Sequence, residues 1–429
     1  GNNSSLALMH DCIAYALLKG APGSARPWSK EEEIRFLCPV PGYDRHFALC
    51  ETYGIGMVPV PMRDDGPDMD VVEEQARDHR VKGMWAVPQY SNPGGETYSD
   101  AVVERLARMA TGAPDFRLFW DNAYALHHLT ERRPSLRNIL DACAEAGHPD
   151  RAIVFASTSK VTLAGAGLAM LASSEANVRW YLANAGKRSI GPDKLNQLRH
   201  ARFLRDQAGL DALMDGHRRL LAPKFRAVTE TLGRHLGGTG VARWSEPEGG
   251  YFILLEVPEG CATRVVKLAA ACGLALTPAG ATHPYGRDPQ DRLLRLAPSY
   301  PSLAEVEAAA DRQRRLGDCF NGPAPAMVEL AELLVDTLPH ADWAMFQKNG
   351  TDATTTCVTI ARAMSLARIR SFDAPVETSP NTMASALRPP SRVAICPWRS
   401  SLELRKRSSV PSRSRVISLW VPICDSACE

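Results

Sequence analysis

The stretch Ser157-Thr158-Ser159-Lys160 decides how the rest of this sequence is interpreted. It follows an apolar run over residues 152–156 that is typical of a buried parallel strand, and it precedes a glycine-rich run over residues 164–167. A lysine at the carboxyl end of such a strand lies where open α/β sheets bind their ligands. If this lysine is partly removed from water, it can lose its proton and form a Schiff base with a carbonyl group. An ordinary surface lysine at a strand end is the alternative.

Two earlier apolar runs also end in polar residues. Asn92 follows the first run, and Asp121 with Tyr124 follows the second. The two runs cover residues 83–88 and 116–120. We therefore expect three strand ends to present Asn92, Asp121 with Tyr124, and Lys160 at one edge of a sheet.

This set of side chains is the one that pyridoxal phosphate requires. A carboxylate such as Asp121 keeps the ring nitrogen protonated, so that the ring can act as an electron sink. Neutral donors such as Asn92 and Tyr124 fix the ring hydroxyl, and Lys160 carries the aldehyde and moves the proton at the substrate α-carbon. Hydroxyl and backbone N–H groups hold the phosphate. The residues therefore predict a pyridoxal phosphate site.

The same motifs carry a family resemblance. Asn92-Pro93-Gly94-Gly95, Asp121-Asn122-Ala123-Tyr124 and Ser157-Thr158-Ser159-Lys160, in this order, resemble class I/II aminotransferases of pyridoxal-phosphate fold type I. Residues 38–45 (Cys-Pro-Val-Pro-Gly-Tyr-Asp-Arg) and 190–194 (Ile-Gly-Pro-Asp-Lys) are most similar to the MocR-type, aspartate-aminotransferase-like branch. The resemblance covers about residues 1–315. It implies a homodimeric aminotransferase that moves an amino group between an aspartate-like amino acid and a 2-oxo acid through a Lys160 Schiff base.

The resemblance also assigns roles to individual residues. The aromatic ring of Tyr43 is expected to stack on the cofactor ring, although a turn tyrosine packed for its area is the alternative. Arg295 is expected to bind the substrate α-carboxylate with its guanidinium fork, together with Asn92, although a surface ion pair would also suit an arginine. The expected catalytic residues are Lys160, Asp121 and Tyr124. The expected cofactor-binding residues are Asn3, Ser4, Ser5, Tyr43, Asn92, Asp121, Tyr124, Ser157, Ser159 and Lys160.

The order of the apolar patterns predicts an α/β fold. Strands alternate with amphipathic helices, which indicates a mostly parallel sheet sandwiched by helices. Apolar residues three or four apart over residues 194–236 predict long helices, interrupted near Gly209 and Pro223. A smaller α+β domain follows. The expected domains are 1–205 (large, cofactor-binding), 206–315 (small), 316–368 and 369–429.

The first residues run directly into a helix pattern, for which Ser4 or Ser5 is a good N-cap. In the resembling family this turn cradles the cofactor phosphate, and a sizeable segment precedes it. We therefore expect the chain to be truncated at its N-terminus, which leaves open whether it is active. A second departure is the absence of the usual phosphate-binding arginine, because Leu168 and Ala169 stand at the comparable positions. Lys187, Arg188 or Lys194 could compensate, or they could be solvated surface charges.

Composition excludes several other classes of protein. The 429 residues are 45% hydrophobic and 23% charged, which is ordinary for a globular protein, and the net charge of +2 gives no general attraction to nucleic acid or membranes. No run is long and apolar enough to span a membrane, and no secretion signal opens the chain. The 11 cysteines include no CxxC pair, so we expect no disulfide framework and no metal site. The expected compartment is the cytoplasm.

The C-terminal part follows a different pattern. Residues 317–364, with Asn349-Gly350-Thr351-Asp352, resemble the early part of class III aminotransferases of the glutamate-1-semialdehyde aminomutase type. Residues from about 369 are rich in Pro, Ser and Arg, and we expect them to be disordered. This tail could bind nucleic acid or have no function, and we favour the latter. The alternatives to an aminotransferase are a cofactor-binding regulatory module, an inactive chimeric fragment, or a class III enzyme.

Overall fold

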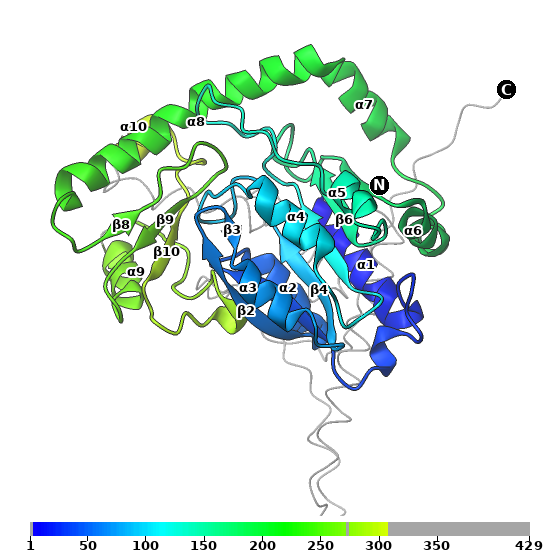
Figure 1. Ribbon diagram of the computed structural model, residues 1–429. Coiled ribbons are helices and arrows are strands. Elements are labelled where there is room, and N and C mark those ends of the chain that lie inside the picture. The colour runs from blue at the N-terminus through cyan, green and yellow to red at the C-terminus, as the bar shows by residue number, and fades with distance from the viewer. Residues whose placement is uncertain (1–2, 272–273, 308–429) are drawn as a thin grey trace, which may run out of the picture. The chain divides into compact units, whose positions relative to one another are not determined.

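The computed structural model describes residues 3–271 and 274–307, which all belong to one compact unit, Gly1–Gly317 (Figure 1). The predictions for residues 316–368 and 369–429 lie outside the described residues. No helix within the described ranges is long and apolar enough to cross a membrane.

A seven-stranded sheet forms the centre of the fold, in the order β3-β2-β1-β4-β5-β6-β7. The five strands from β2 to β6 in this order are parallel, and the two edge strands β3 and β7 are antiparallel to their neighbours. The strands are β1 (Arg35–Val40), β2 (Gly56–Arg63), β3 (Gly66–Pro67), β4 (Val81–Ala86), β5 (Arg117–Asp121), β6 (Ala152–Ser157) and β7 (Ala169–Ser173). The mostly parallel sheet predicted from the sequence is therefore confirmed.

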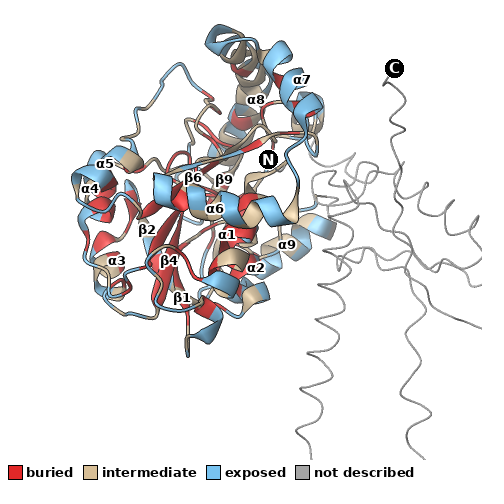
Figure 2. Cartoon of the chain, turned by 90° about the vertical axis from the view of Figure 1, so that its right-hand side faces the viewer, coloured by how far each residue is buried: buried red, intermediate tan, exposed pale blue. Residues whose placement is uncertain are grey.

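Helices cover both faces of this sheet, and its central strands β4 and β5 are wholly buried (Figure 2). On one face Val72, Leu106 and Ile139 pack from α3, α4 and α5, and on the other Ile13 and Phe47 pack from α1 and α2. The helices of this layer are α1 (Ser5–Lys19), η1 (Trp28–Lys30), α2 (Asp44–Tyr53), α3 (Met69–Gln75), α4 (Asp100–Arg108), α5 (Ile139–Glu145) and α6 (Glu175–Arg188). A sheet buried on both faces explains why its central strands read as continuous apolar runs.

A second, antiparallel sheet of three strands follows, in the order β10-β9-β8. Its hydrophobic cluster includes Leu255, Ala262 and Leu294. The elements of this region are β8 (Arg243–Trp244), β9 (Ile253–Glu256), α9 (Ala262–Ala271), η2 (Pro284–Gly286), β10 (Leu293–Leu296) and α10 (Leu303–Glu307). This agrees with the predicted smaller α+β part.

The predicted interruption at Pro223 is wrong. Helices α7 (Lys194–Leu204) and α8 (Gln207–Leu236) connect the two sheets, and α8 continues through Pro223. Burial of Phe225 and Met214 holds the helix on either side of the proline, so tertiary packing outweighs the lost backbone hydrogen bond. The chain breaks instead at Arg205, which has a positive φ of 63°. Gly209 marks a helix start, because its N–H donates to the Asp206 side chain at 2.8 Å.

Asp115, just before β5, carries a buried polar network at the end of the sheet where the parallel strands begin. Its carboxylate lies 2.9 Å from Lys82 Nζ and accepts hydrogen bonds from Trp28 Nε1 at 2.7 Å and Ser24 Oγ at 2.6 Å. Burial alone would raise the pKa of Asp115, but these three donors outweigh burial and hold the pKa below its usual value. The network therefore favours the ionised carboxylate in the folded chain.

We expect the Asp115→Ala substitution to lower the free energy of unfolding by about 3 kcal/mol, because it leaves a buried lysine without its main partner. A carboxyl with a lower pKa in the folded chain stabilises the fold above the unfolded pKa of about 4, and this contribution is lost as pH falls further. Urea unfolding of wild type and variant at pH 7 and pH 3 measures both effects. The difference in the free energy of unfolding between wild type and variant should be smaller at pH 3 than at pH 7. Asp70→Asn, which removes an exposed partner of Arg105, is the control that should change little.

Candidate active site

Three neighbouring strands bring the predicted residues to one edge of the sheet. Strands β4, β5 and β6 are adjacent and parallel, so their carboxyl ends lie together. Asn92 lies in the loop after β4, Asp121 is the last residue of β5, and Ser157 is the last residue of β6. Lys160 follows Ser157 in a turn. The structure therefore brings together the side chains that the sequence placed at separate strand ends.

Lys160 lies beside an aromatic ring and is held by its backbone. Its Nζ atom is 4.8 Å from the centroid of the Tyr124 ring. Burial lowers the pKa of Lys160, and the nearby carboxylate of Asp121 partly opposes this shift. The Tyr251 hydroxyl donates to the Lys160 carbonyl at 3.0 Å, and His127 Nε2 lies 3.4 Å from the same oxygen. The result is a fixed lysine with an increased share of the neutral, nucleophilic amine.

Asp121 is buried and has a histidine partner that the sequence analysis missed. His46 Nε2 lies 3.2 Å from Asp121 Oδ2, and the His46 ring stacks on Trp85 with a centroid distance of 4.3 Å and an interplanar angle of 8°. His46 stands three residues after Tyr43, in the first turn of α2, and the two rings are 4.9 Å apart. The three-residue spacing between Tyr43 and His46 was the one signal in the sequence that could have indicated His46, because residues three apart lie on the same side of a helix.

Tyr124 and Tyr43 are neutral phenols at this edge. Burial raises the pKa of Tyr124 well above its usual value, with a further contribution from nearby Tyr43 and Asp121. Burial also raises the pKa of Tyr43. Both hydroxyls therefore keep their protons at neutral pH and can donate hydrogen bonds.

Arg295 comes from the second sheet and closes the site on its other side. It is buried, on β10, and its Nη1 atom lies 2.9 Å from Asp44 Oδ1 and 3.3 Å from Asn92 Oδ1. Its guanidinium carbon lies 4.9 Å from the centroid of the Phe252 ring. Arg295 and Asn92, expected to share one ligand, thus touch each other across 203 residues of sequence.

Three segments meet at the start of α1 and form the hydroxyl-rich end of the site. Ser157 donates to Ser159 at 3.2 Å, Ser159 donates to the Asn3 carbonyl at 2.8 Å, and the Asn3 amide donates to the Gly165 carbonyl at 3.0 Å. Ser4 caps α1 by accepting from the Ala7 N–H at 3.4 Å, and Ser5 is the first residue of that helix. A helix N-terminus with nearby hydroxyls favours an anion.

No arginine stands among these hydroxyls at positions 168 and 169, where Leu168 and Ala169 are found. Of the three cations considered as substitutes, Arg188 forms an ion pair with Asp11 at 3.2 Å. Lys187 and Lys194 are exposed. Their part in binding an anion stays a prediction.

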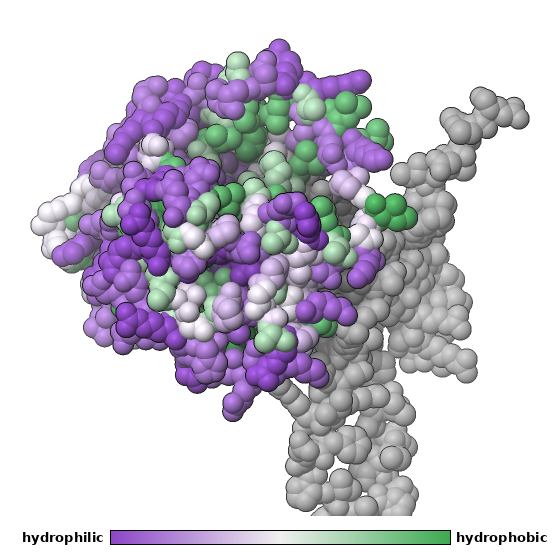
Figure 3. Space-filling view, turned by 45° about the vertical axis from the view of Figure 1, so that its right-hand side comes forward, coloured by the Kyte–Doolittle hydropathy of each residue, from purple (hydrophilic) through white to green (hydrophobic). Residues whose placement is uncertain are grey.

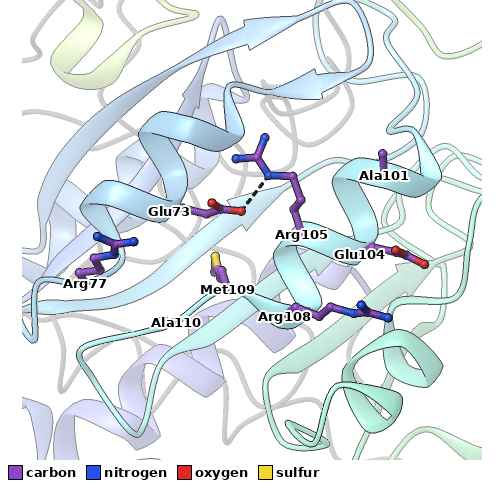
Figure 4. Close-up of a pocket in the computed structure, with 8 residues that line it drawn as sticks. All are labelled: Glu73, Arg77, Ala101, Glu104, Arg105, Arg108, Met109 and Ala110. Atoms are coloured by element: carbon purple, nitrogen blue, oxygen red, sulfur yellow. Dashed lines mark hydrogen bonds and ion pairs between the residues drawn. The ribbon is translucent and has the colours of Figure 1, made fainter.

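A surface depression between α3 and α4 is a separate feature (Figure 4). Arg105 in this depression forms ion pairs with Glu73 at 2.8 Å and Asp70 at 2.6 Å. None of the residues expected at the active site lines it. We therefore assign this depression no part in the site.

Comparison with known proteins agrees with this geometry. Residues 1–315 match the family described as aspartate amino-transferase. The chain belongs to the aspartate aminotransferase family. A protein of Mycolicibacterium smegmatis that is named an aminotransferase is 54% identical over 312 residues, which are 72% of this chain and 73% of that protein. Relatives that are 50–54% identical to this chain are named aminotransferases or transaminases, which confirms the prediction of a pyridoxal-phosphate-dependent transaminase.

Solved structures of aminotransferases share the fold. The crystal structure of an aspartate transaminase from Corynebacterium glutamicum is 50% identical, with a TM-score of 0.71 over 72% of this chain and 73% of that one. The α-aminoadipate aminotransferase LysN of Thermus thermophilus, crystallised with N-(5'-phosphopyridoxyl)-L-leucine, is 22% identical, with a TM-score of 0.61 over 73% and 75%. At 22% identity, the comparison with LysN supports the similarity of the fold alone. Both agree with the large sheet and smaller second sheet described above.

Proposed function

We propose that this aminotransferase binds pyridoxal phosphate at the edge formed by β4, β5 and β6 and transfers the amino group of aspartate to a 2-oxo acid. The observation that carries the proposal is a pair of buried polar atoms without a hydrogen-bond partner in the described part of the chain. They are Asp121 Oδ1 and Asn92 Nδ2. Buried polar groups without partners are rare, and two at one site point to a missing ligand.

The chemistry of these two atoms fits the cofactor, and that of the neighbouring Arg295 fits an amino acid. Asp121 Oδ1 is an acceptor suited to a protonated ring nitrogen, and Asn92 Nδ2 is a donor suited to a ring hydroxyl. Arg295 is a cation suited to a carboxylate. The remaining proposed contacts are Tyr124 to the ring hydroxyl, Tyr43 to the ring face, and Asn3, Ser4, Ser5, Ser157 and Ser159 to the phosphate.

When bound, pyridoxal phosphate supplies the electron sink for the α-carbon of the amino acid. The chain's own residues supply the rest. Lys160 holds the cofactor covalently and, as a neutral amine, moves a proton at the substrate α-carbon, a task that its lowered pKa assists. Asp121, held by His46, keeps the ring nitrogen protonated. Arg295 and Asn92 orient the substrate through its α-carboxylate.

The test is a substrate panel on the purified, cofactor-loaded protein. We expect the highest kcat/KM with aspartate and 2-oxoglutarate, and lower values with alanine and aromatic amino acids. Arg295→Lys should raise KM for every amino acid by about tenfold, because a lysine cannot form the two parallel hydrogen bonds of a guanidinium fork. Cofactor uptake without amino transfer to any 2-oxo acid would contradict the proposal.

The chain is further proposed to form a homodimer. Large hydrophobic side chains are exposed along α6, α7 and the link between them, at Leu182, Ile190, Leu195 and Phe203. Hydrophobic atoms are visible at the surface on this side of the molecule (Figure 3). Exposed apolar patches mark surfaces that bind another protein. Light scattering coupled to gel filtration measures the molar mass in solution, which distinguishes a monomer from a dimer.

The finer predictions rest on the sequence. We propose that the chain belongs to the MocR-type branch because of the motif at residues 38–45. We also propose that residues 317–364 are related to class III aminotransferases because of the Asn-Gly-Thr motif. The domain limits at 205 and 315 also stay predictions. The cytoplasm stays the proposed compartment, since the five cysteines of the described part, Cys12, Cys38, Cys50, Cys143 and Cys261, are free thiols.

A further inference from the structure

Arg295 already holds a carboxylate of its own chain. Its Nη1 atom is 2.9 Å from Asp44 Oδ1, and this ion pair joins β10 of the second sheet to the first residue of α2 in the large sheet layer. The arginine side chain is 9% exposed, and the aspartate side chain is 31% exposed. The pair therefore consists of a buried cation and a carboxylate that faces solvent. A buried cation needs such compensation while no ligand is bound.

A ligand carboxylate needs the same atom of Arg295. The Nε atom is buried, so a carboxylate that arrives from solvent meets the Nη end of the guanidinium. A two-point contact at that end requires Nη1. Nη1 already has two acceptors, Asp44 Oδ1 and Asn92 Oδ1. The two hydrogens of Nη1 are thus both in use, and one acceptor must leave before the fork can form.

Asp44 is the acceptor that can leave at low cost. It is partly exposed, whereas Asn92 is buried. It also lies in the first turn of α2, where the N-terminal end of the helix dipole stabilises a carboxylate in more than one side-chain position. The N-cap residue Tyr43 makes no side-chain cap hydrogen bond, so its side chain does not compete with the Asp44 carboxylate at this helix end.

From this geometry we propose that Asp44 is an internal competitor for Arg295, which the α-carboxylate of the substrate displaces. The proposal rests on the function proposed above, in which Arg295 receives that carboxylate. Asp44 keeps the buried cation neutralised between turnovers and weakens substrate and product binding alike. It also acts as a specificity-determining residue, because an amine without a carboxylate offers Arg295 nothing in exchange for the lost ion pair.

The experiment measures binding of maleate, a dicarboxylate without an amino group, to the cofactor-loaded protein by calorimetry. We expect Asp44→Asn to tighten maleate binding by about tenfold, the effect of removing one competing charge-assisted hydrogen bond. In turnover, KM for aspartate should fall while kcat changes less. Asp100→Asn is the matched control, since Asp100 is an exposed acidic residue in the first turn of α4, and it should leave maleate binding unchanged.

A double-mutant cycle separates competition at Arg295 from a general loss of negative charge. In the Arg295→Gln background, Asp44→Asn should no longer tighten maleate binding. Asp44→Ser, which suits a helix start, repeats the test if the asparagine variant folds poorly, and it should give the same sign. Weaker binding in the Asp44 variants would show that Asp44 supports Arg295 instead, and unchanged binding, or a gain that persists without Arg295, would equally overturn the proposal. Failure of Arg295→Gln to weaken maleate binding would contradict the proposed function itself.

Discussion

Replacing Lys160 with alanine is expected to lower the rate of amino transfer by at least about 10⁴-fold, because one amine is proposed both to hold the cofactor and to move the proton. The Tyr124 ring, 4.8 Å from Nζ, and the two side chains at the Lys160 carbonyl should keep the surrounding backbone in place. The loss should therefore come from the missing amine. Small amines added to the variant should restore part of the rate.

Borohydride reduction of the wild-type protein provides a readout that does not depend on activity. It should fix the cofactor to Lys160 as a stable secondary amine, and peptide mapping should find the label there. Lys267→Ala, which removes an exposed lysine of α9, is the control and should keep both label and activity. A label on any other lysine would show that the assignment of Lys160 is wrong.

The second large effect is expected for Asp121→Asn, which should lower kcat by about 10³-fold, the scale of losing one preorganised electrostatic partner. An amide cannot keep the ring nitrogen protonated, although it has nearly the same shape as the carboxylate. His46→Phe is the graded comparison, because it keeps the stacking on Trp85 but loses the contact to Asp121. We expect His46→Phe to lower kcat by about tenfold.

Absorbance spectra and thermal unfolding accompany these rates. Both variants should still take up the cofactor and unfold near the wild-type temperature, since the stacked rings around Trp85 remain. Wild-type turnover in Asp121→Asn would mean that the carboxylate at the end of β5 does not serve the ring nitrogen. Equal losses in the two variants would mean that His46 does more than position Asp121.

The sequence was most informative where function depends on local order along the chain. Asn92, Asp121 and Lys160 each follow an apolar strand, so their meeting at one sheet edge follows from parallel topology alone. Arg295 could be expected only through the family resemblance, because its contact with Asn92 spans 203 residues. His46 and Asp44 were missed as site residues for the same reason, since each acts through a partner that is distant in sequence.

Errors in the fold prediction also have physical causes. Pro223 predicted a break, but packing of Phe225 in α8 against Ile253 and Leu129 outweighs the local preference. The antiparallel direction of β7 was not predicted, because it depends on a turn that apolar periodicity does not encode.

Tyr251 and Phe252 are consecutive, and together they touch both ends of the proposed reaction. The hydroxyl of Tyr251 reaches the Lys160 carbonyl, and the ring of Phe252 lies against Arg295. The preceding turn packs closely as well, because a Cβ atom on Gly249 would lie 2.2 Å from the Tyr90 ring. An inserted or deleted residue in this turn would shift Tyr251 or Phe252, so that the contacts to Lys160 and to Arg295 could not both form. Anyone who recombines segments among these enzymes to alter substrate choice should therefore transplant residues 247–252 together with the partners they contact.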